Sequence, residues 1–363
     1  MKSKGKLLKG FRAAIALVLI AVAIGCVATR LPQVFSDRDT ALAAAAFTLT
    51  DGRMFAESGT EPSTAASEAP PNTRPHTERK AAVAADTQPK QRDKSSYYDS
   101  FGNHDGEARY SVAEKTVQPY GVAVDGCYLT DTTSEDVDFL SLLQAPLTFR
   151  IQRNADAPQV LIYHTHTSEA YLDEDVDYFY ESYESRTGNN DFNVVAVGDA
   201  IAAVLEKNGI KTLHDKTVHD STYNGSYDRS AQTVQADREK YPSVKVALDI
   251  HRDALGTEDC KVKTVFTHNG HKAAQIMILS GCDPDNDRGF ENWQNNLSFA
   301  LKLQHTAESL YPGMTRPLDF GYFAYNEYIC DGSLLIEIGT DANTVDEAAY
   351  TGQLLADVLS RVL

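Results

Sequence analysis

The chain has 363 residues, enough for one large domain or two small ones with additional segments. Its formal net charge of −17 at pH 7 argues against nucleic acid as a partner, because phosphate binding needs a basic surface. Hydrophobic residues make up 42% of the chain, which is ordinary for a protein that buries a core.

Residues 1–30 have the pattern of a membrane anchor. Residues 1–12 carry five cations and no acid, and no charge follows until Arg30. The uncharged run is about 26 Å long as a helix, which is enough to cross the hydrocarbon core. Cations before the span place the N-terminus in the cytoplasm and the rest of the chain outside. We therefore predict a single-pass membrane protein with its transmembrane helix at residues 13–30.

Two alternatives to a retained anchor remain open. A signal peptide would be cleaved after the apolar run, and a lipoprotein would be cleaved before Cys26. No convincing small-x-small site follows the run, and Ala23 stands where a lipoprotein signal would have leucine. We favour the retained anchor.

Residues 31–104 are expected to form an extracytoplasmic tether that is mostly disordered. From residue 56 to about residue 100 the chain consists largely of Ala, Ser, Thr, Pro, Glu and Lys, which cannot build a core. Such a flexible segment has a root-mean-square reach of roughly 35–40 Å. Residues 105–156 contain short apolar stretches without a clear period, and we interpret them as an N-terminal extension of the domain that follows.

Residues 157–363 alternate between predicted strands and predicted helices. The strands are at 159–163, 210–215, 244–250 and 333–339, and the helices are at 194–209, 230–242, 291–313 and 344–363. Asn269 and Gly270 predict a hairpin between strands 261–267 and 273–281. This order predicts an α/β domain with a mostly parallel twisted sheet flanked by helices.

Three of the predicted strands end in residues that can bind metal or transfer protons. In open α/β sheets, sites lie just beyond the carboxyl ends of the strands. Histidine and carboxylate side chains are zinc ligands, and three of them leave a fourth position for a water molecule. The metal lowers the pKa of that water to about 7, and a nearby carboxylate can accept its proton. The pattern predicts a zinc site among His164, His166, Glu169, His251, Arg252 and Glu337.

At these residues the chain resembles a known family. The stretches YHTHTSEAY, HDSTYNGSYDRS, LDIHRDA and LLIEIGTDANT are similar to the stage II sporulation protein P family of endospore-forming bacteria. That family is similar to zinc-dependent N-acetylmuramoyl-L-alanine amidases. The resemblance covers residues 157–363 and implies a membrane-held hydrolase that cuts peptidoglycan at the septum during engulfment. It also implies a second activity on peptide cross-links, and stage II sporulation proteins D and M as partners.

The resemblance also implies roles for single residues. His166 and His251 match the two histidine ligands of zinc, and Glu337 matches the catalytic glutamate. Glu169 is the expected third ligand, although the ligand glutamate of those amidases usually comes further along the chain. We expect no organic cofactor.

Two more residues are predicted to assist catalysis. His164 is expected to support the metal ligands or to polarise the substrate. Arg252 is placed to hold a substrate carboxylate as a two-pronged donor, with an ion pair to Asp253 or another acid as the alternative.

Other classes of function remain open. A zinc carboxypeptidase or endopeptidase acting on wall peptides would use the same metal chemistry, and a wall-binding scaffold would use none. The cysteines are uninformative: an ideal hairpin leaves Cys260 and Cys282 offset by about 10 Å along the strand, beyond disulfide reach. We predict no bridge between them.

Overall fold

The computed structural model of the chain describes residue 104 and residues 106–363. The predicted anchor and nearly all of the predicted tether lie outside these residues. Within the described part of the chain, no helix combines the length and the apolar character needed to cross a membrane.

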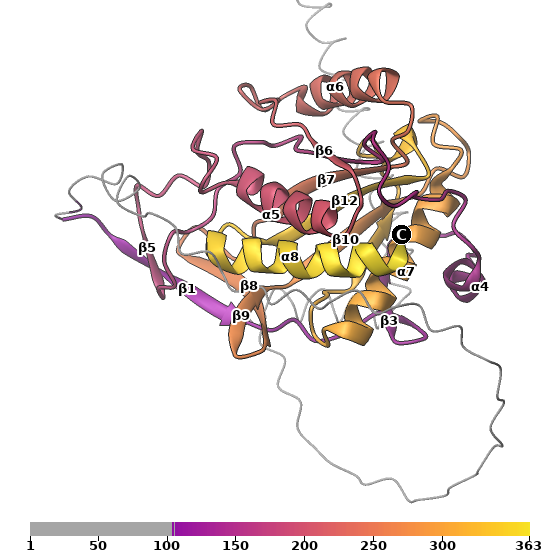
Figure 1. The fold of residues 1–363 in the computed structure, drawn as a ribbon. Helices are drawn as coiled ribbons and strands as arrows, with labels where there is room; N and C mark the ends of the chain where they lie inside the picture. The colour runs from indigo at the N-terminus through magenta and orange to yellow at the C-terminus, as the bar shows by residue number, and fades with distance from the viewer. Residues whose placement is uncertain (1–103, 105) are drawn as a thin grey trace, which may run out of the picture. The chain divides into compact units, whose positions relative to one another are not determined.

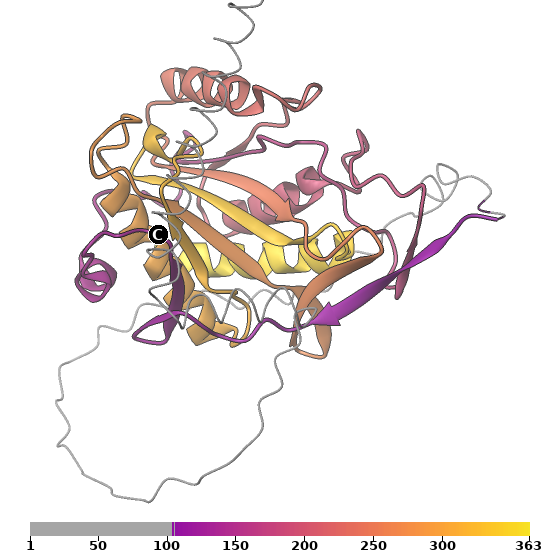
Figure 2. The same cartoon turned by 180° about the vertical axis from the view of Figure 1, so that it is seen from behind.

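The described residues contain an eight-stranded sheet at the centre of an α/β fold (Figures 1 and 2). Most of its neighbouring strands are parallel, but β2 pairs with β3 and β10 pairs with β12 in antiparallel orientation. The α/β class is confirmed, and the sheet is mostly parallel, as predicted, but mixed because of these two antiparallel pairs. In order across the sheet, the strands are β2 (Val122–Val124), β3 (Cys127–Asp131), β11 (Leu318–Gly321), β10 (Ile276–Gly281), β12 (Gly332–Thr340), β7 (Val246–Asp253), β4 (Val160–Tyr163) and β6 (Thr212–His214).

Helices cover both faces of this sheet. On one face, α5 (Val194–Lys207), α7 (Trp293–Leu310) and α8 (Val345–Val362) enclose the larger hydrophobic core. On the other face, α6 (Ser226–Lys240) packs over β4 and β7 (Figure 2). Leu248 and Ile250 of β7 belong to the larger core, whereas Ala247 packs with Val234 of α6. Because side chains alternate along a strand, His251 of β7 points toward the α6 face.

The helix ends follow local signals in the sequence. The Asn193 side chain accepts from the Val195 amide at the start of α5, and Gly209 follows that helix with φ +75°. Helix α8 begins with the predicted capping box of Thr344 and Glu347. Helix α6 begins at residue 226, four residues before the predicted start at 230. The sequence did not reveal this first turn, because it is polar and carries no apolar periodicity.

A second, four-stranded sheet contains the predicted hairpin. Its order is β5 (Tyr178–Tyr180), β1 (Arg109–Lys115), β8 (Cys260–His268) and β9 (His271–Ala274). Strands β8 and β9 pair up to His268 and His271, with Asn269 at φ 49° and Gly270 at φ 79° between them. The hairpin is therefore confirmed. Two positive φ angles explain the Asn-Gly sequence, because these residues adopt that conformation most readily.

The hairpin ladder is shorter than expected. It ends at Val265 and Ala274, after which the chain leaves for the large sheet as β10. Cys260 pairs with Ser111 of β1, so the ideal register between Cys260 and the strand before Cys282 does not form. In the described part of the chain the cysteines are free: Cys127, Cys260, Cys282 and Cys330.

The predicted extension at residues 105–156 contributes to both sheets. It supplies β1 to the small sheet, β2 and β3 to the large sheet, and a short helix α4 (Phe139–Gln144) against α7. These elements are three to seven residues long. None of these elements was predicted, because the apolar stretches of residues 105–156 follow no clear period in the sequence.

Candidate metal centre

The strand register brings the predicted site together. Strands β4, β7 and β12 are adjacent and parallel. His166 and Glu169 lie in the turn that follows β4, and His251 lies near the carboxyl end of β7. Glu337 of β12 is the direct partner of His251 across the β7–β12 ladder. Because paired residues of neighbouring strands point to the same face, both side chains lie on the α6 side of the sheet.

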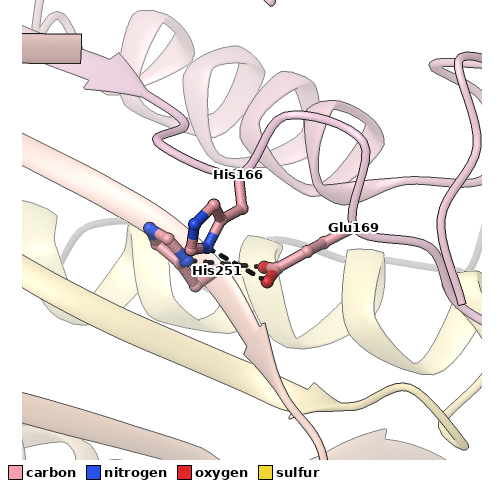
Figure 3. Close-up of side chains that lie close together, drawn as sticks. All are labelled: His166, Glu169 and His251. Carbon is pink, nitrogen blue, oxygen red and sulfur yellow. Dashed lines mark ion pairs between the residues drawn. The ribbon is translucent and has the colours of Figure 1, made fainter. Parts of the chain in front are cut away.

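His166, Glu169 and His251 form one compact group (Figure 3). The Nδ1 atom of His166 lies 3.4 Å from Oε1 of Glu169, and the Nδ1 atom of His251 lies 3.4 Å from Oε2 of the same carboxylate. All three side chains are buried, and one possible ligand atom from each lies within 4.8 Å of the others. The three proposed ligands therefore converge as predicted.

The donor set fits a zinc ion. Tetrahedral zinc with bonds of about 2.0–2.2 Å to nitrogen and oxygen places neighbouring ligand atoms about 3.3–3.5 Å apart. Each of the two 3.4 Å contacts has this spacing, one to each oxygen of the Glu169 carboxylate. Two histidines and one glutamate also match catalytic zinc sites, in which the fourth position is open.

The charges at the group also favour a cation. Burial alone would raise the pKa of Glu169, but its contacts with His166 and His251 outweigh burial and hold the pKa well below the ordinary value. Burial alone would lower the pKa of His251, but the carboxylates of Asp249 and Glu169 hold it well above the ordinary value. Positive charge is thus stabilised at this position, as a divalent metal requires.

Asp249 is a member of the site that the sequence reasoning missed. Its carboxylate accepts hydrogen bonds from the backbone amide (2.8 Å) and the hydroxyl (2.6 Å) of Thr165. Its Oδ1 atom lies 2.9 Å from Nε2 of His251. A carboxylate behind a ligand histidine fixes the orientation of the ring. The alternation of β7 could have revealed it, because residues 249 and 251 share a face.

We expect Asp249→Asn to weaken zinc binding by about 10–100-fold, the usual effect of losing the charged outer partner of a metal ligand. Competition against a colorimetric zinc chelator measures the change. Asp253→Asn is the matched control, because Asp253 lies on the same strand and pairs with Arg316 at 2.7 Å. Unaltered zinc affinity in Asp249→Asn would show that Asp249 does not support the ligand.

Glu337 stands beside the group with a free carboxylate oxygen. The residue is half-buried, and its Oε2 atom is shielded from solvent with no hydrogen-bond partner in the described part of the chain. Burial raises the pKa of Glu337 to about 8; the charge of His251 opposes this and that of Glu169 adds to it. At this pKa the carboxyl group is mostly protonated at pH 7, and a cation held by the three neighbouring ligands would lower the pKa so that the unused oxygen can accept a proton from a reacting group.

Arg252 has a different role from the predicted one. Its Nε atom donates to the carbonyl of Ala170 at 3.1 Å, and Nη2 donates to the carbonyl of Ser185 at 2.6 Å. The side chain is buried, and Asp253 pairs with Arg316 instead. The structure therefore places the guanidinium against the backbone of the loop that follows Glu169. The predicted ion pair with Asp253 does not form, and two nitrogens of the guanidinium group already donate to backbone carbonyls.

His164 lies outside the group as well. Its Nδ1 atom donates to the carbonyl of Ile250 at 2.8 Å, and its Nε2 atom lies 2.8 Å from Nε2 of His214. Burial, with the neighbouring His214 adding to it, lowers the pKa of His164 to about 3. The ring is neutral and packs against Gly198 of α5, where an added Cβ would lie 3.0 Å from Nε2. In this position it supports the end of β4 and does not reach the ligands.

The comparison with known proteins identifies the family. The family described as Stage II sporulation protein P (SpoIIP) matches residues 47–360. The chain belongs to this family. The resemblance seen in the four sequence motifs is confirmed.

One curated member of the SpoIIP family gives the scale of this likeness. Stage II sporulation protein P from Bacillus subtilis (strain 168) is 29% identical over 230 residues, which are 58% of this chain and 52% of that protein. The match therefore spans about half the length of the relative.

Solved amidase structures are similar only at a distance. Apo Ami1, the N-acetylmuramyl-L-alanine amidase of Mycobacterium abscessus, has a TM-score of 0.34 and 11% identity, covering 57% of this chain and 99% of that one. The CwlD amidase of Clostridioides difficile, solved with the GerS lipoprotein, has a TM-score of 0.33 and 10% identity, covering 56% and 98%. At these TM-scores the likeness carries no argument about function.

Proposed function

We propose that the protein is a zinc-dependent peptidoglycan hydrolase that cleaves the amide between N-acetylmuramic acid and L-alanine. The observation that carries the proposal is the buried group of His166, Glu169 and His251 with the free Glu337 carboxylate on the neighbouring strand. Membership of the SpoIIP family supports sporulation as the setting.

In this proposal each residue of the site has a defined task. His166, Glu169 and His251 would hold the zinc ion, and Asp249 keeps the His251 ring in orientation. When bound, zinc supplies Lewis acidity that polarises a carbonyl and acidifies water. Glu337 accepts a proton from the water whose oxygen attacks the amide carbon. It then donates that proton to the nitrogen as the carbon–nitrogen bond breaks, so lactyl carboxylate and free amine are released.

Muropeptide analysis tests the proposal directly. The zinc-loaded chain, purified in detergent, is incubated with isolated peptidoglycan, and the products are weighed by mass spectrometry. A freed lactyl carboxylate with a released peptide is the expected result. A cut between two amino acids would identify the endopeptidase or carboxypeptidase alternative. Intact peptidoglycan, together with no bound zinc in protein purified without chelators, would favour the wall-binding scaffold.

We also propose that residues 13–30 hold the protein in the cytoplasmic membrane, with the described domain on the outer side. The sequence pattern of residues 1–30 supports this placement. Fractionation and external protease treatment of protoplasts check it: residues 106–363 should be accessible and membrane-bound.

Stage II sporulation proteins D and M are proposed partners on the family resemblance alone, and co-purification from sporulating cells tests them.

A further inference from the structure

A row of aromatic rings leads from the metal centre to the surface. The Tyr227 ring stacks parallel to His251, with 6.4 Å between centroids and 9° between planes. The Tyr325 ring lies 5.3 Å from Tyr227, and Phe323 lies 4.9 Å from Tyr325. Tyr325 is 37% exposed. We call Tyr227, Tyr325 and Phe323 the ring shelf.

The backbone of the ring shelf adopts an unfavourable conformation. Tyr325 has φ 38°, in a region that bulky residues rarely occupy, and Asn326 follows with φ 64°, which asparagine tolerates. The side-chain amide of Asn326 holds this turn in place, because its Nδ2 atom donates to the carbonyl of Tyr227 at 3.1 Å and to the Ser230 hydroxyl at 3.0 Å. Strain that is maintained by such specific contacts is a feature of binding and catalytic sites.

Two glycines let the turn pack closely on the sheet. A Cβ at Gly281 would lie 2.1 Å from the carbonyl oxygen of Phe323, and one at Gly321 would lie 2.8 Å from the Phe323 ring. The Gly281 amide donates to the buried Glu327 carboxylate at 2.9 Å. The turn is therefore held against strands β10 and β11 of the sheet, and this keeps the Tyr325 ring beside Tyr227.

The two sides of the metal centre differ in charge. On the β12 side, none of the three side chains of the ring shelf carries a charge. On the β4 side, Arg186 is half-exposed and lies with its guanidinium 5.3 Å from the centre of the Tyr223 ring.

Arg186 brings positive charge next to the ligands themselves. Its Nη2 atom lies 3.7 Å from Oε1 of Glu169, and Nη1 pairs with Asp220 at 2.6 Å. The Tyr223 ring beneath it stacks on His166 at 4.8 Å. A negatively charged group of the ligand would therefore meet a guanidinium on the β4 side, whereas the ring shelf offers an uncharged aromatic surface.

We propose that the ring shelf binds the neutral glycan part of the substrate, with Tyr325 as the residue that selects for it. This inference rests on the proposed function, whose substrate joins an uncharged sugar to a peptide with free carboxylates. A sugar ring presents an apolar face that can stack on an exposed aromatic ring, which is rigid and costs little entropy to use. The peptide then extends toward Arg186. The scissile amide would lie at the metal centre with its sugar on the β12 side and its peptide on the β4 side.

Binding measurements with Tyr325→Asn test the proposal without turnover. Asparagine tolerates a positive φ, so the substitution removes the ring and keeps the turn. Isothermal titration of the full chain, zinc-loaded in detergent, is made with a hexamer of N-acetylglucosamine and separately with the free stem peptide. We expect Tyr325→Asn to bind the hexamer at least about fivefold more weakly, as expected for one lost stacking contact, with unchanged affinity for the peptide.

Two further variants control for side effects. Tyr325→Phe keeps the ring and should bind the hexamer as the unaltered chain does. Tyr120→Asn removes a tyrosine that is 57% exposed next to β2, at the far edge of the sheet, and should change nothing. The melting temperature of each variant reports on folding.

Several outcomes would overturn the inference. They are unchanged hexamer binding in Tyr325→Asn, a loss confined to the peptide, or no hexamer binding by the unaltered chain. Failure of the proposed function is distinguishable from these, because a chain that binds the hexamer through Tyr325 but leaves muropeptides intact would retain the inference without the hydrolase.

Discussion

Replacing His251 by alanine is expected to remove stoichiometric zinc and hydrolase activity together. Its Nδ1 atom is one of three converging donors, and two remaining ligands would hold the metal weakly. The loss of zinc affinity should exceed the about 10–100-fold that follows the loss of an outer partner. His166→Ala should have the same effect. Metal analysis after gel filtration, followed by the muropeptide assay, measures both quantities.

An exposed histidine provides the control for this experiment. His305 lies on α7, its side chain is 42% exposed, and its nearest acid, Asp125, is 3.8 Å away. His305→Ala should keep zinc, activity and melting temperature. Stoichiometric zinc in His251→Ala or His166→Ala would exclude that residue as a ligand.

The ligands could be predicted because they lie at the ends of buried strands that the sequence shows clearly. Glu169 was predicted as well, but it departs from the pattern of the related amidases because it comes only three residues after His166. The structure explains this spacing: the Glu169 amide donates to the His166 carbonyl at 3.2 Å, which closes a tight turn. The turn brings the carboxylate back toward His166, and the β7 strand next to it supplies the second histidine.

The roles of Arg252 and His164 could not be read from their neighbours in sequence. Arg252 follows His251 on β7, so alternation sends its side chain to the opposite face of the sheet. His164 follows β4 in the same way, with Tyr163 toward α6 and His164 toward α5. Adjacent residues at a strand end therefore point to opposite faces of the sheet. A sequence motif does not separate the two faces, so it groups residues that do not share a site.

Long-range pairing sets a second limit on sequence reasoning. Strand β1 pairs in parallel with β8, about 150 residues later, from Ser111 with Cys260 to Lys115 with Thr264. The sequence of neither strand indicates which other strand it pairs with. The tyrosines around the metal centre were likewise not predicted, because Tyr223 and Tyr325 lie in loops whose positions depend on α6 and β12.

The second large effect is expected from Glu337→Gln. The amide keeps the shape of the side chain and removes the basic oxygen, so losing the general base should slow turnover by about 10²–10⁴-fold. Zinc content should stay stoichiometric, because Glu337 lies outside the group of three donors. Its Oε2 atom has no hydrogen-bond partner in the described part of the chain, so the substitution breaks no bond to that atom and the melting temperature should change little. Steady-state cleavage of muropeptides and metal analysis give the two readings.

The separation of turnover from metal retention distinguishes Glu337 from the histidines. Glu114→Gln controls for the loss of a carboxylate elsewhere, because Glu114 pairs with Lys272 at 2.6 Å on the small sheet. Near-normal turnover in Glu337→Gln would rule out the base. Loss of zinc would instead make Glu337 a ligand, and Glu169 would then serve only to hold the two imidazoles. Slow turnover with full zinc is the one result that fits a carboxylate placed opposite His251 to move a proton.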